Sequence, residues 1–210
     1  MKESNKVVVI GGGAAGMMAA GTAASLGAHV TLLEPNGKLG KKLFITGKGR
    51  CNVTNNCAGD EVLKNVPTNP RFLYGALAGF SPADAMAFFE EHGCQLKTER
   101  GNRVFPESDQ AGSVIDALRR FLKETRVEIR WERALEIEAA DGAVTGVRTQ
   151  TGRLPADRVI LATGGCSYPA TGSTGDGYRL AGSLGHTIIE PRGSLVPLVE
   201  KGHTCGAMQG

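Results

Sequence analysis

The first part of the chain alternates between short apolar runs and a segment of small residues, which predicts a strand, a helix and a second strand. Val7–Ile10 is a run of β-branched residues followed by glycine, as in strands buried on both faces of a parallel sheet. Ala14–Leu26 is dominated by Ala, Met and Leu, which favour helix, and Gly27 stands where a C-terminal cap belongs. His29–Leu33 is the next strand. Such a unit forms a right-handed crossover between parallel strands.

The middle of the chain predicts a loop followed by two helices. Residues 35–69 are rich in Gly, Lys, Asn and Thr and show little periodicity, which indicates a long ordered loop with room for one short helix. Ser81 as N-cap and Pro82 at the first helical position open a helix that runs to about His92. A second helix is expected over Ala111–Glu124, because its apolar residues share one face.

The last third reads as short strands separated by turns. The predicted β-meander comprises Val127–Trp131, Ala134–Ala139, Val144–Gln150 and Arg153–Leu154. Arg158–Ala162 is expected to be a buried strand that returns to the first sheet, and 175–184 a short helix after a Gly/Ser/Thr loop. The fold class is therefore α/β: a Rossmann-like domain over 1–190, with a parallel central sheet, a helical stretch at 81–124 and a β-meander at 127–155.

Composition narrows the classes of partner. The 210 residues carry 24 Lys and Arg against 21 Asp and Glu, a net charge of +3 that is too even for a nucleic-acid footprint. No apolar stretch reaches the ~18 residues of a membrane span, and the polar start of the chain lacks a secretory signal. The five cysteines are scattered without zinc spacing. We expect a cytoplasmic protein that binds a small molecule and neither nucleic acid nor membrane.

Glycines between the first strand and the first helix carry the strongest chemical signal. Gly11-x-Gly13-x-x-Gly16 assigns one glycine to a tight turn, one to close approach of the main chain to a pyrophosphate, and one to helix–strand packing. Glu34 ends the second strand, where a carboxylate accepts hydrogen bonds from ribose hydroxyls and disfavours the 2′-phosphate of NADP. The candidate contact residues are Gly11, Gly13, Ala14, Ala15, Gly16 and Glu34. The pattern leaves FAD and NAD open.

The segment after Glu34 combines flexible glycines with Lys and Arg, a composition suited to an anionic ligand but also typical of a solvated basic loop. Its run Thr46–Asn55 resembles the signature of the bacterial aminoacetone-oxidase-like, or BaiN-like, NAD(P)/FAD-dependent oxidoreductases. The resemblance extends from Val7 to about Val199 and includes Arg103–Pro106, Val159–Gly165 and Thr171–Gly177.

The resemblance implies a flavoprotein of the two-dinucleotide-binding-domain type, with FAD as the cofactor. The glycine fingerprint and Glu34 would hold the ADP half, and the following loop would lie along the pyrophosphate and flavin. The turn after the returning strand would pass near the adenine or pyrophosphate, and the Gly-Asp-Gly segment near the ribityl chain or flavin. The implied contact residues are Lys41, Lys42, Gly49, Arg50, Cys51, Asn52, Ala162, Thr163, Gly164, Gly165, Gly175 and Asp176.

Simpler structural roles compete with several of these assignments. Thr163 is also a reasonable strand cap, and Asp176 a reasonable helix cap. A Cys51 thiolate beside a flavin, with its pKa lowered by Arg50, is less favoured than a small buried residue that packs beneath the ligand. The four histidines show no triad or metal spacing, so no metal site is expected and the catalytic residue is unknown.

Three functions follow. The leading one is an FAD-dependent oxidoreductase that moves hydride between the flavin, a small organic substrate and NAD(P)H or oxygen. The relatives that the sequence resembles continue further, so residues 191–210 are expected to begin a substrate or insertion domain that is missing here. This favours, as second function, an FAD-binding fragment without turnover and with weaker FAD retention. The third is an NAD-binding dehydrogenase domain without flavin. The oligomeric state is unknown.

Overall fold

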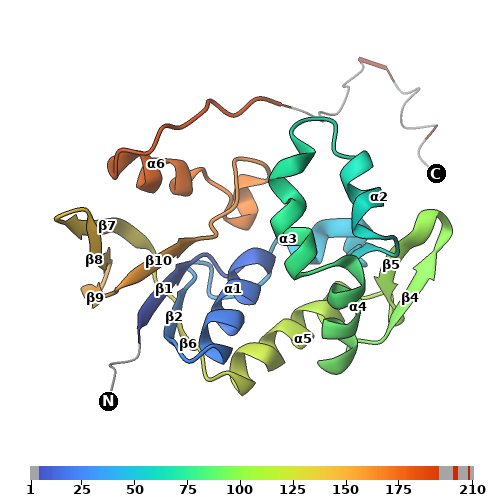
Figure 1. Cartoon of the computed structure of the whole chain (residues 1–210), viewed down its shortest axis with the longest axis horizontal. Helices are drawn as coiled ribbons and strands as arrows, with labels where there is room; N and C mark the ends of the chain where they lie inside the picture. The colour runs from blue at the N-terminus through green and yellow to red at the C-terminus, as the bar shows by residue number, and fades with distance from the viewer. Residues whose placement is uncertain (1–4, 194–200, 203–207, 209–210) are drawn as a thin grey trace.

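The computed structural model describes residues 5–193, 201–202 and 208, so most of the predicted domain start at 191–210 lies outside the described residues. Its centre is a four-stranded parallel sheet in the order β10-β1-β2-β6 (Figure 1). The strands are β1 (Lys6–Ile10), β2 (His29–Leu33), β6 (Glu128–Arg130) and β10 (Arg158–Leu161). The first strand–helix–strand unit and the return of the last strand to this sheet are therefore confirmed. The expectation that the returning strand is buried was wrong, because β10 is an edge strand whose residues are exposed or half-buried.

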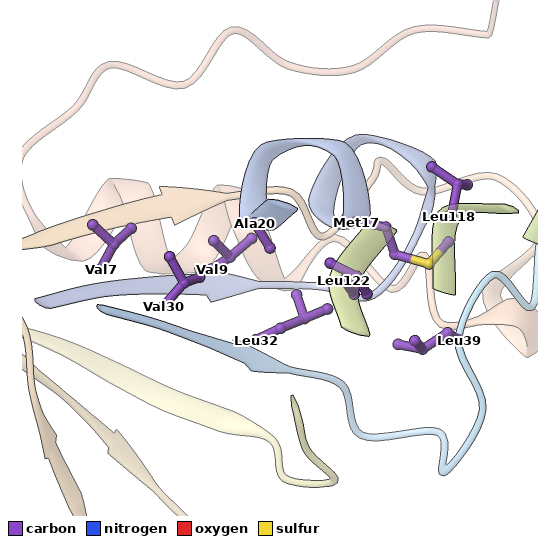
Figure 2. Close-up of a cluster of buried hydrophobic side chains, with 9 residues drawn as sticks. All are labelled: Val7, Val9, Met17, Ala20, Val30, Leu32, Leu39, Leu118 and Leu122. Carbon is purple, nitrogen blue, oxygen red and sulfur yellow. The ribbon is translucent and has the colours of Figure 1, made fainter. Parts of the chain in front are cut away.

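Alternate residues of β1 supply the cores on the two faces of this sheet. Val7 and Val9 pack with α1 (Ala14–Ser25) and α5 (Ala111–Glu124), and Figure 2 shows Leu118 and Leu122 beside Met17 in this cluster. The other residues of the strand, Val8 and Ile10, pack with the meander and with α6 (Asp176–Ser183). The result is a three-layer α/β domain, as predicted, and the helix over 111–124 is confirmed to the residue.

The strand predicted over 127–131 was wrongly assigned to the meander. β6 pairs in parallel with β2, while the meander contains only β7 (Ala134–Ala140), β8 (Ala143–Thr149) and β9 (Arg153–Pro155) among the described residues. Short apolar strands read alike in parallel and antiparallel sheets. The sequence pattern therefore grouped this strand with the strands that follow it directly in the chain. In the structure β6 follows α5 and pairs with β2, so it completes a second crossover.

A second small sheet interrupts the predicted helical stretch 81–124. β3 (Thr54–Asn55), β5 (Arg103–Pro106) and β4 (Leu96–Glu99) form it, with a 3₁₀ turn η3 (Arg100–Asn102) inside the β4–β5 hairpin. In Figure 1 this hairpin lies on the opposite side of the molecule from the meander. The strands were missed because their sequences, L-K-T-E and R-V-F-P, are only four residues long, and the first contains a single apolar residue.

Several short helices surround these sheets. α4 (Pro82–Glu91) begins as predicted, with a capping box in which Ser81 and Asp84 satisfy each other's main-chain N–H groups. The loop predicted over 35–69 contains η1 (Leu43–Gly49) and α2 (Gly59–Lys64). The sequence pattern missed η2 (Pro70–Leu73) and α3 (Tyr74–Gly79). The helix predicted at 175–184 is α6, preceded by η4 (Pro169–Thr171).

Within the described residues, no helix taken alone has the length and apolar character to cross a membrane; the segments Pro70–Gly79 and Pro82–Glu91 reach that threshold only when joined across their bend.

Candidate dinucleotide site

A cavity of about 620 Å³ opens at the carboxyl ends of β1, β2 and β10. We call it the sheet-edge cavity. Its walls are the glycine turn after β1, the segments that follow β2 and β6, the turn after β10, and the start of α6. Open α/β sheets place ligands at this edge, and the volume lies in the usual range of about 300–1,000 Å³ for ligand pockets.

The glycine turn brings three main-chain segments together. Gly11 has φ +110°, and a Cβ there would lie 2.5 Å from the carbonyl oxygen of Ala162. A Cβ on Gly16 would overlap the carbonyl oxygen of Gly11. Both positions therefore require glycine for internal packing. Gly13 differs, because a Cβ added there would meet nothing within 4 Å, so its missing side chain opens the cavity instead.

The N-terminus of α1 supplies the wall that suits an anion. Gly13 is the N-cap and offers no side-chain hydrogen bond, and the first turn contains no acidic residue. The first N–H groups of a helix lack partners within the helix, and Gly13, Ala14 and Ala15 all line the cavity. These N–H groups and the positive end of the helix dipole favour a phosphate at this point.

Glu34 is held rigidly beside this helix end. Its side chain is only 7% exposed, and one carboxylate oxygen accepts a hydrogen bond from Gly12 N–H at 2.8 Å. The other oxygen accepts bonds from the main-chain N and the Nδ2 of Asn36, at 2.8 and 2.6 Å. The bonds fix the orientation of the carboxylate and leave lone pairs for hydroxyl donors at the cavity surface. A buried negative charge here fits ribose and opposes a 2′-phosphate.

Two lysines follow on the same side, and one of them acts as a strap. Lys42 Nζ donates to the carbonyl oxygen of Ser167 at 2.8 Å and to Ser173 Oγ at 2.6 Å. The lysine therefore joins the segment after β2 to the segment before α6 across the cavity. Lys41 also lines the cavity. The pair gives this wall positive charge toward a phosphate-bearing ligand.

The turn after β10 packs closely on the start of α6. Ala162 N–H donates to Ile10 O at 2.8 Å, which keeps the turn against the glycine turn. A Cβ on Gly177 would overlap the hydroxyl oxygen of Thr163, so the two segments can pack this closely only with glycine there. Gly175 N–H donates a hydrogen bond to Gly165 O at 3.2 Å. Ala162, Thr163 and Gly164 line the cavity, whereas Gly165 and Gly175 support it from behind.

Asp176 lines the sheet-edge cavity together with Arg133. Its carboxylate pairs with Arg133 at 2.5 Å, and Arg133 follows β6, whose residue Arg130 accepts a hydrogen bond from Glu34 N–H. The pair joins the β6–β7 connection to the start of α6 at the cavity wall. The expected place of Asp176 near a ribityl chain or flavin stays a prediction. Asp176 is the first residue of α6, but no side-chain cap bond is formed there.

The signature loop, Thr46–Asn55, lies mainly outside the sheet-edge cavity. Arg50 pairs with Glu99 and, at 2.8 Å, with Asp109, and its guanidinium lies 4.1 Å from the ring centre of Phe105. The positive charge of Arg50 is therefore paired with carboxylates in and beside the β4–β5 hairpin. Hydrogen bonding to Glu99 raises the pKa of Arg50 further.

Cys51 is buried, as the less reactive interpretation expected. It is 3% exposed, and burial raises the pKa of its thiol, although a hydrogen bond with Thr46 acts in the other direction. A thiolate stabilised by Arg50 is thus contradicted. Asn52 donates from Nδ2 to the carbonyl oxygens of Thr54 and Val104, at 3.0 and 2.9 Å.

The structure thus divides the predicted site residues into two groups. Those that line the sheet-edge cavity are Gly11, Gly13, Ala14, Ala15, Glu34, Lys41, Lys42, Ala162, Thr163, Gly164 and Asp176. Those that do not are Gly16, Gly49, Arg50, Cys51, Asn52, Gly165 and Gly175. The sequence reading missed the lining residues Asn36, Glu132, Arg133 and Ser173. Ser173 lies inside the Thr171–Gly177 motif, whereas Arg133 follows β6, the strand that the sequence pattern assigned to the wrong sheet. No group of three metal-ligating side chains occurs in the described segments.

Comparisons with known proteins agree with this architecture. Residues 5–209 match the HI0933-like protein Rossmann domain. The chain is 38% identical over 203 residues to the 3-dehydro-bile acid delta(4,6)-reductase of Clostridium scindens, covering 95% of this chain and 48% of that protein. It is 30% identical to the ribosomal RNA dihydrouridine synthase of Escherichia coli, covering 90% and 47%. The chain thus spans about half the length of these curated relatives.

Solved structures show the same fold at low identity. A flavocytochrome c3 fumarate reductase superposes with a TM-score of 0.61 at 23% identity, covering 87% of this chain and 41% of that one. The L-proline dehydrogenase from P. horikoshii gives a TM-score of 0.54 at 16% identity, covering 91% and 58%. The match over nearly the whole chain confirms the family expected from the sequence: the protein belongs to the HI0933-like family of FAD-binding Rossmann-fold proteins.

Proposed function

We propose that this chain binds FAD in the sheet-edge cavity as part of an oxidoreductase. The observation that carries the proposal is the joint placement of the helix α1 N-terminus and the Glu34 carboxylate on one cavity wall. A pyrophosphate fits the first and a ribose fits the second. Bound FAD would supply the hydride chemistry, which side chains alone do not provide.

Each group of residues has a distinct task in this proposal. Gly13, Ala14 and Ala15 bind the pyrophosphate through main-chain N–H groups, and Glu34 orients the ribose. Lys42 holds the segment before α6 against the cavity, and the Arg133–Asp176 pair holds the start of α6 against the segment that follows β6. Gly11, Gly16, Ala162, Gly165 and Gly175 act indirectly, by keeping the three main-chain segments close.

We further propose a small organic molecule as the substrate and NAD(P)H as a source of electrons. The name of the Clostridium scindens relative describes the reduction of a bile acid, and that protein is the more similar of the two curated relatives compared above. The name of the Escherichia coli relative describes a change in ribosomal RNA. The even charge balance of this chain favours the small-molecule alternative.

The second candidate is FAD binding without turnover by this chain alone. It is supported by the coverage of about half of each curated relative, because the names of those proteins describe the activity of chains about twice the matched length.

A purified sample separates these alternatives. An absorbance band at about 450 nm that remains after gel filtration supports FAD binding. Absence of this band after reconstitution with FAD contradicts the proposal. Oxidation of NADH or NADPH with added FAD and oxygen then supports the oxidoreductase, whereas bound flavin without oxidation supports the second candidate. Glu34→Gln is the matched control when FAD is added near the dissociation constant of wild type, because at that concentration a rate that the variant does not lower arises from free flavin.

A further inference from the structure

A second cavity, of about 260 Å³, lies between α1, α4 and α5. We call it the apolar chamber. The signature loop closes one side through Cys51, Asn52 and Val53. Ala14 and Ala15 at the start of α1 line both this chamber and the sheet-edge cavity. The two cavities therefore meet at the helix end where a pyrophosphate fits.

The walls of the apolar chamber are almost free of polar groups. Its main lining side chains are Met18, Leu43, Val53, Phe89, Val114 and Leu118, and none of the described residues that line it is charged. The polar exceptions are Cys51 and Asn52. Asn52 uses its Nδ2 on two main-chain carbonyls and offers no free donor to a ligand, and a thiol such as that of Cys51 is only a weak donor.

Size and polarity together define the ligand class. An apolar cavity of about 150 Å³ holds a benzene ring, so 260 Å³ accommodates two fused rings. A ring with several hydrogen-bonding atoms would lose its partners in water without gaining new ones here, which costs free energy. The polar edge of a flavin ring therefore fits the chamber poorly, whereas a hydrocarbon ring system fits it well.

We propose that the apolar chamber binds an uncharged, apolar ring of about two fused rings, and that this ring is part of the organic substrate. Phe80 is 43% exposed and lines the chamber, which gives the ring a way in from solvent. The shared wall at Ala14 and Ala15 brings the ring next to the proposed cofactor site. The assignment as substrate rests on the proposed function, but ring binding itself does not.

Indole is a suitable probe, titrated into the protein without FAD and followed by calorimetry. Ala85→Leu places three more carbon atoms into the chamber, and Ala87→Leu makes the same change at an exposed position of the same helix. We expect wild type and Ala87→Leu to bind indole equally, and Ala85→Leu to bind it at least about tenfold more weakly. NMR contacts between indole and the Met18 methyl group provide a direct measurement that needs no variant.

Three results would overturn the proposal: indole that does not bind to wild type up to its solubility limit, indole contacts that avoid Met18, and indole binding that saturating FAD abolishes. The last result would assign the chamber to the cofactor. Failure of FAD to bind would contradict the proposed function but leave the indole result intact, so the two failures are distinguishable. FAD binding by Ala85→Leu is expected to equal that of wild type.

Discussion

The glycine turn after β1 and the signature loop are both rich in glycine, but their main chains serve different purposes. In the turn, Gly11 and Gly16 let the main chains of the turn, of α1 and of the segment after β10 pack in direct contact. The groups that face the cavity there are main-chain N–H groups. In the signature loop, a series of left-handed residues that includes Lys48 and Cys51 folds the chain onto β5, where Arg50 is fixed by two carboxylates. The first region builds the cavity, and the second supports its surroundings.

The difference teaches that a charged residue in a motif typical of the family need not face the ligand. Arg50 faces Glu99 and Asp109, while Lys42, eight positions earlier, bridges two segments of the cavity wall. The predictions below test this division between a cavity-forming and a supporting region.

Replacement of Gly16 by alanine should have the largest effect. The new Cβ would overlap the carbonyl oxygen of Gly11, so the helix and strand must separate, at a cost of about 3 kcal/mol. We expect a clear fall in the free energy of unfolding, measured by urea denaturation, and loss of FAD binding. Gly13→Ala is the matched control, since its Cβ meets open space. It should unfold like wild type but bind FAD more weakly. Equal stability of Gly16→Ala and wild type would contradict the packing argument.

Glu34→Gln should weaken FAD binding by about tenfold to a hundredfold, because a charged acceptor for hydroxyl groups is lost from a buried wall. Fluorescence titration with FAD measures the dissociation constant. The variant should also weaken ADP binding by a similar factor. If FAD weakens while ADP does not, Glu34 does not contact the ribose.

Lys42→Met and Arg50→Met compare the two regions directly. Lys42→Met removes the strap to Ser173 and a positive charge from the cavity, so we expect the dissociation constant for FAD to rise by about tenfold. Arg50→Met should leave that constant unchanged within error, because its ion pairs lie on the β4–β5 side. A larger effect of Arg50→Met than of Lys42→Met would contradict the division.

Cysteine alkylation tests a local property of the signature loop, the accessibility of Cys51, and involves the smallest change to the protein. Burial raises the pKa of Cys51 above its ordinary value of 9.0, so its thiolate is scarce at neutral pH and increases only as pH rises through that raised pKa. Cys166 is exposed. Mass spectrometry after iodoacetamide treatment at neutral pH should find Cys166 modified at least about a hundredfold faster than Cys51. Comparable rates would show that the signature loop opens readily.

The sequence predicted best what depends on local pattern. The first strand–helix–strand unit, the capping box at Ser81 and the amphipathic helix 111–124 each have their signal within a few neighbouring residues, and each was confirmed. Their side chains and caps specify them with little contribution from residues far away in the sequence.

Features that depend on distant partners were not predicted. The place of β6 is decided by pairing with β2, about a hundred residues earlier. Arg50 faces carboxylates at positions 99 and 109, which no spacing around the signature loop indicates. Arg133 joins the cavity only because β6 ends there and α6 comes back to meet it.

The central claim, that this cavity is built for the ADP half of FAD, is tested most directly by comparing FAD with FMN. Both carry the same flavin ring, but FMN lacks the adenosine that the Glu34 end would hold. Fluorescence titration of the apoprotein should give a dissociation constant for FAD at least about a hundredfold lower than for FMN, with ADP competing against FAD. Equal affinity for FAD and FMN, without competition by ADP, would contradict the account.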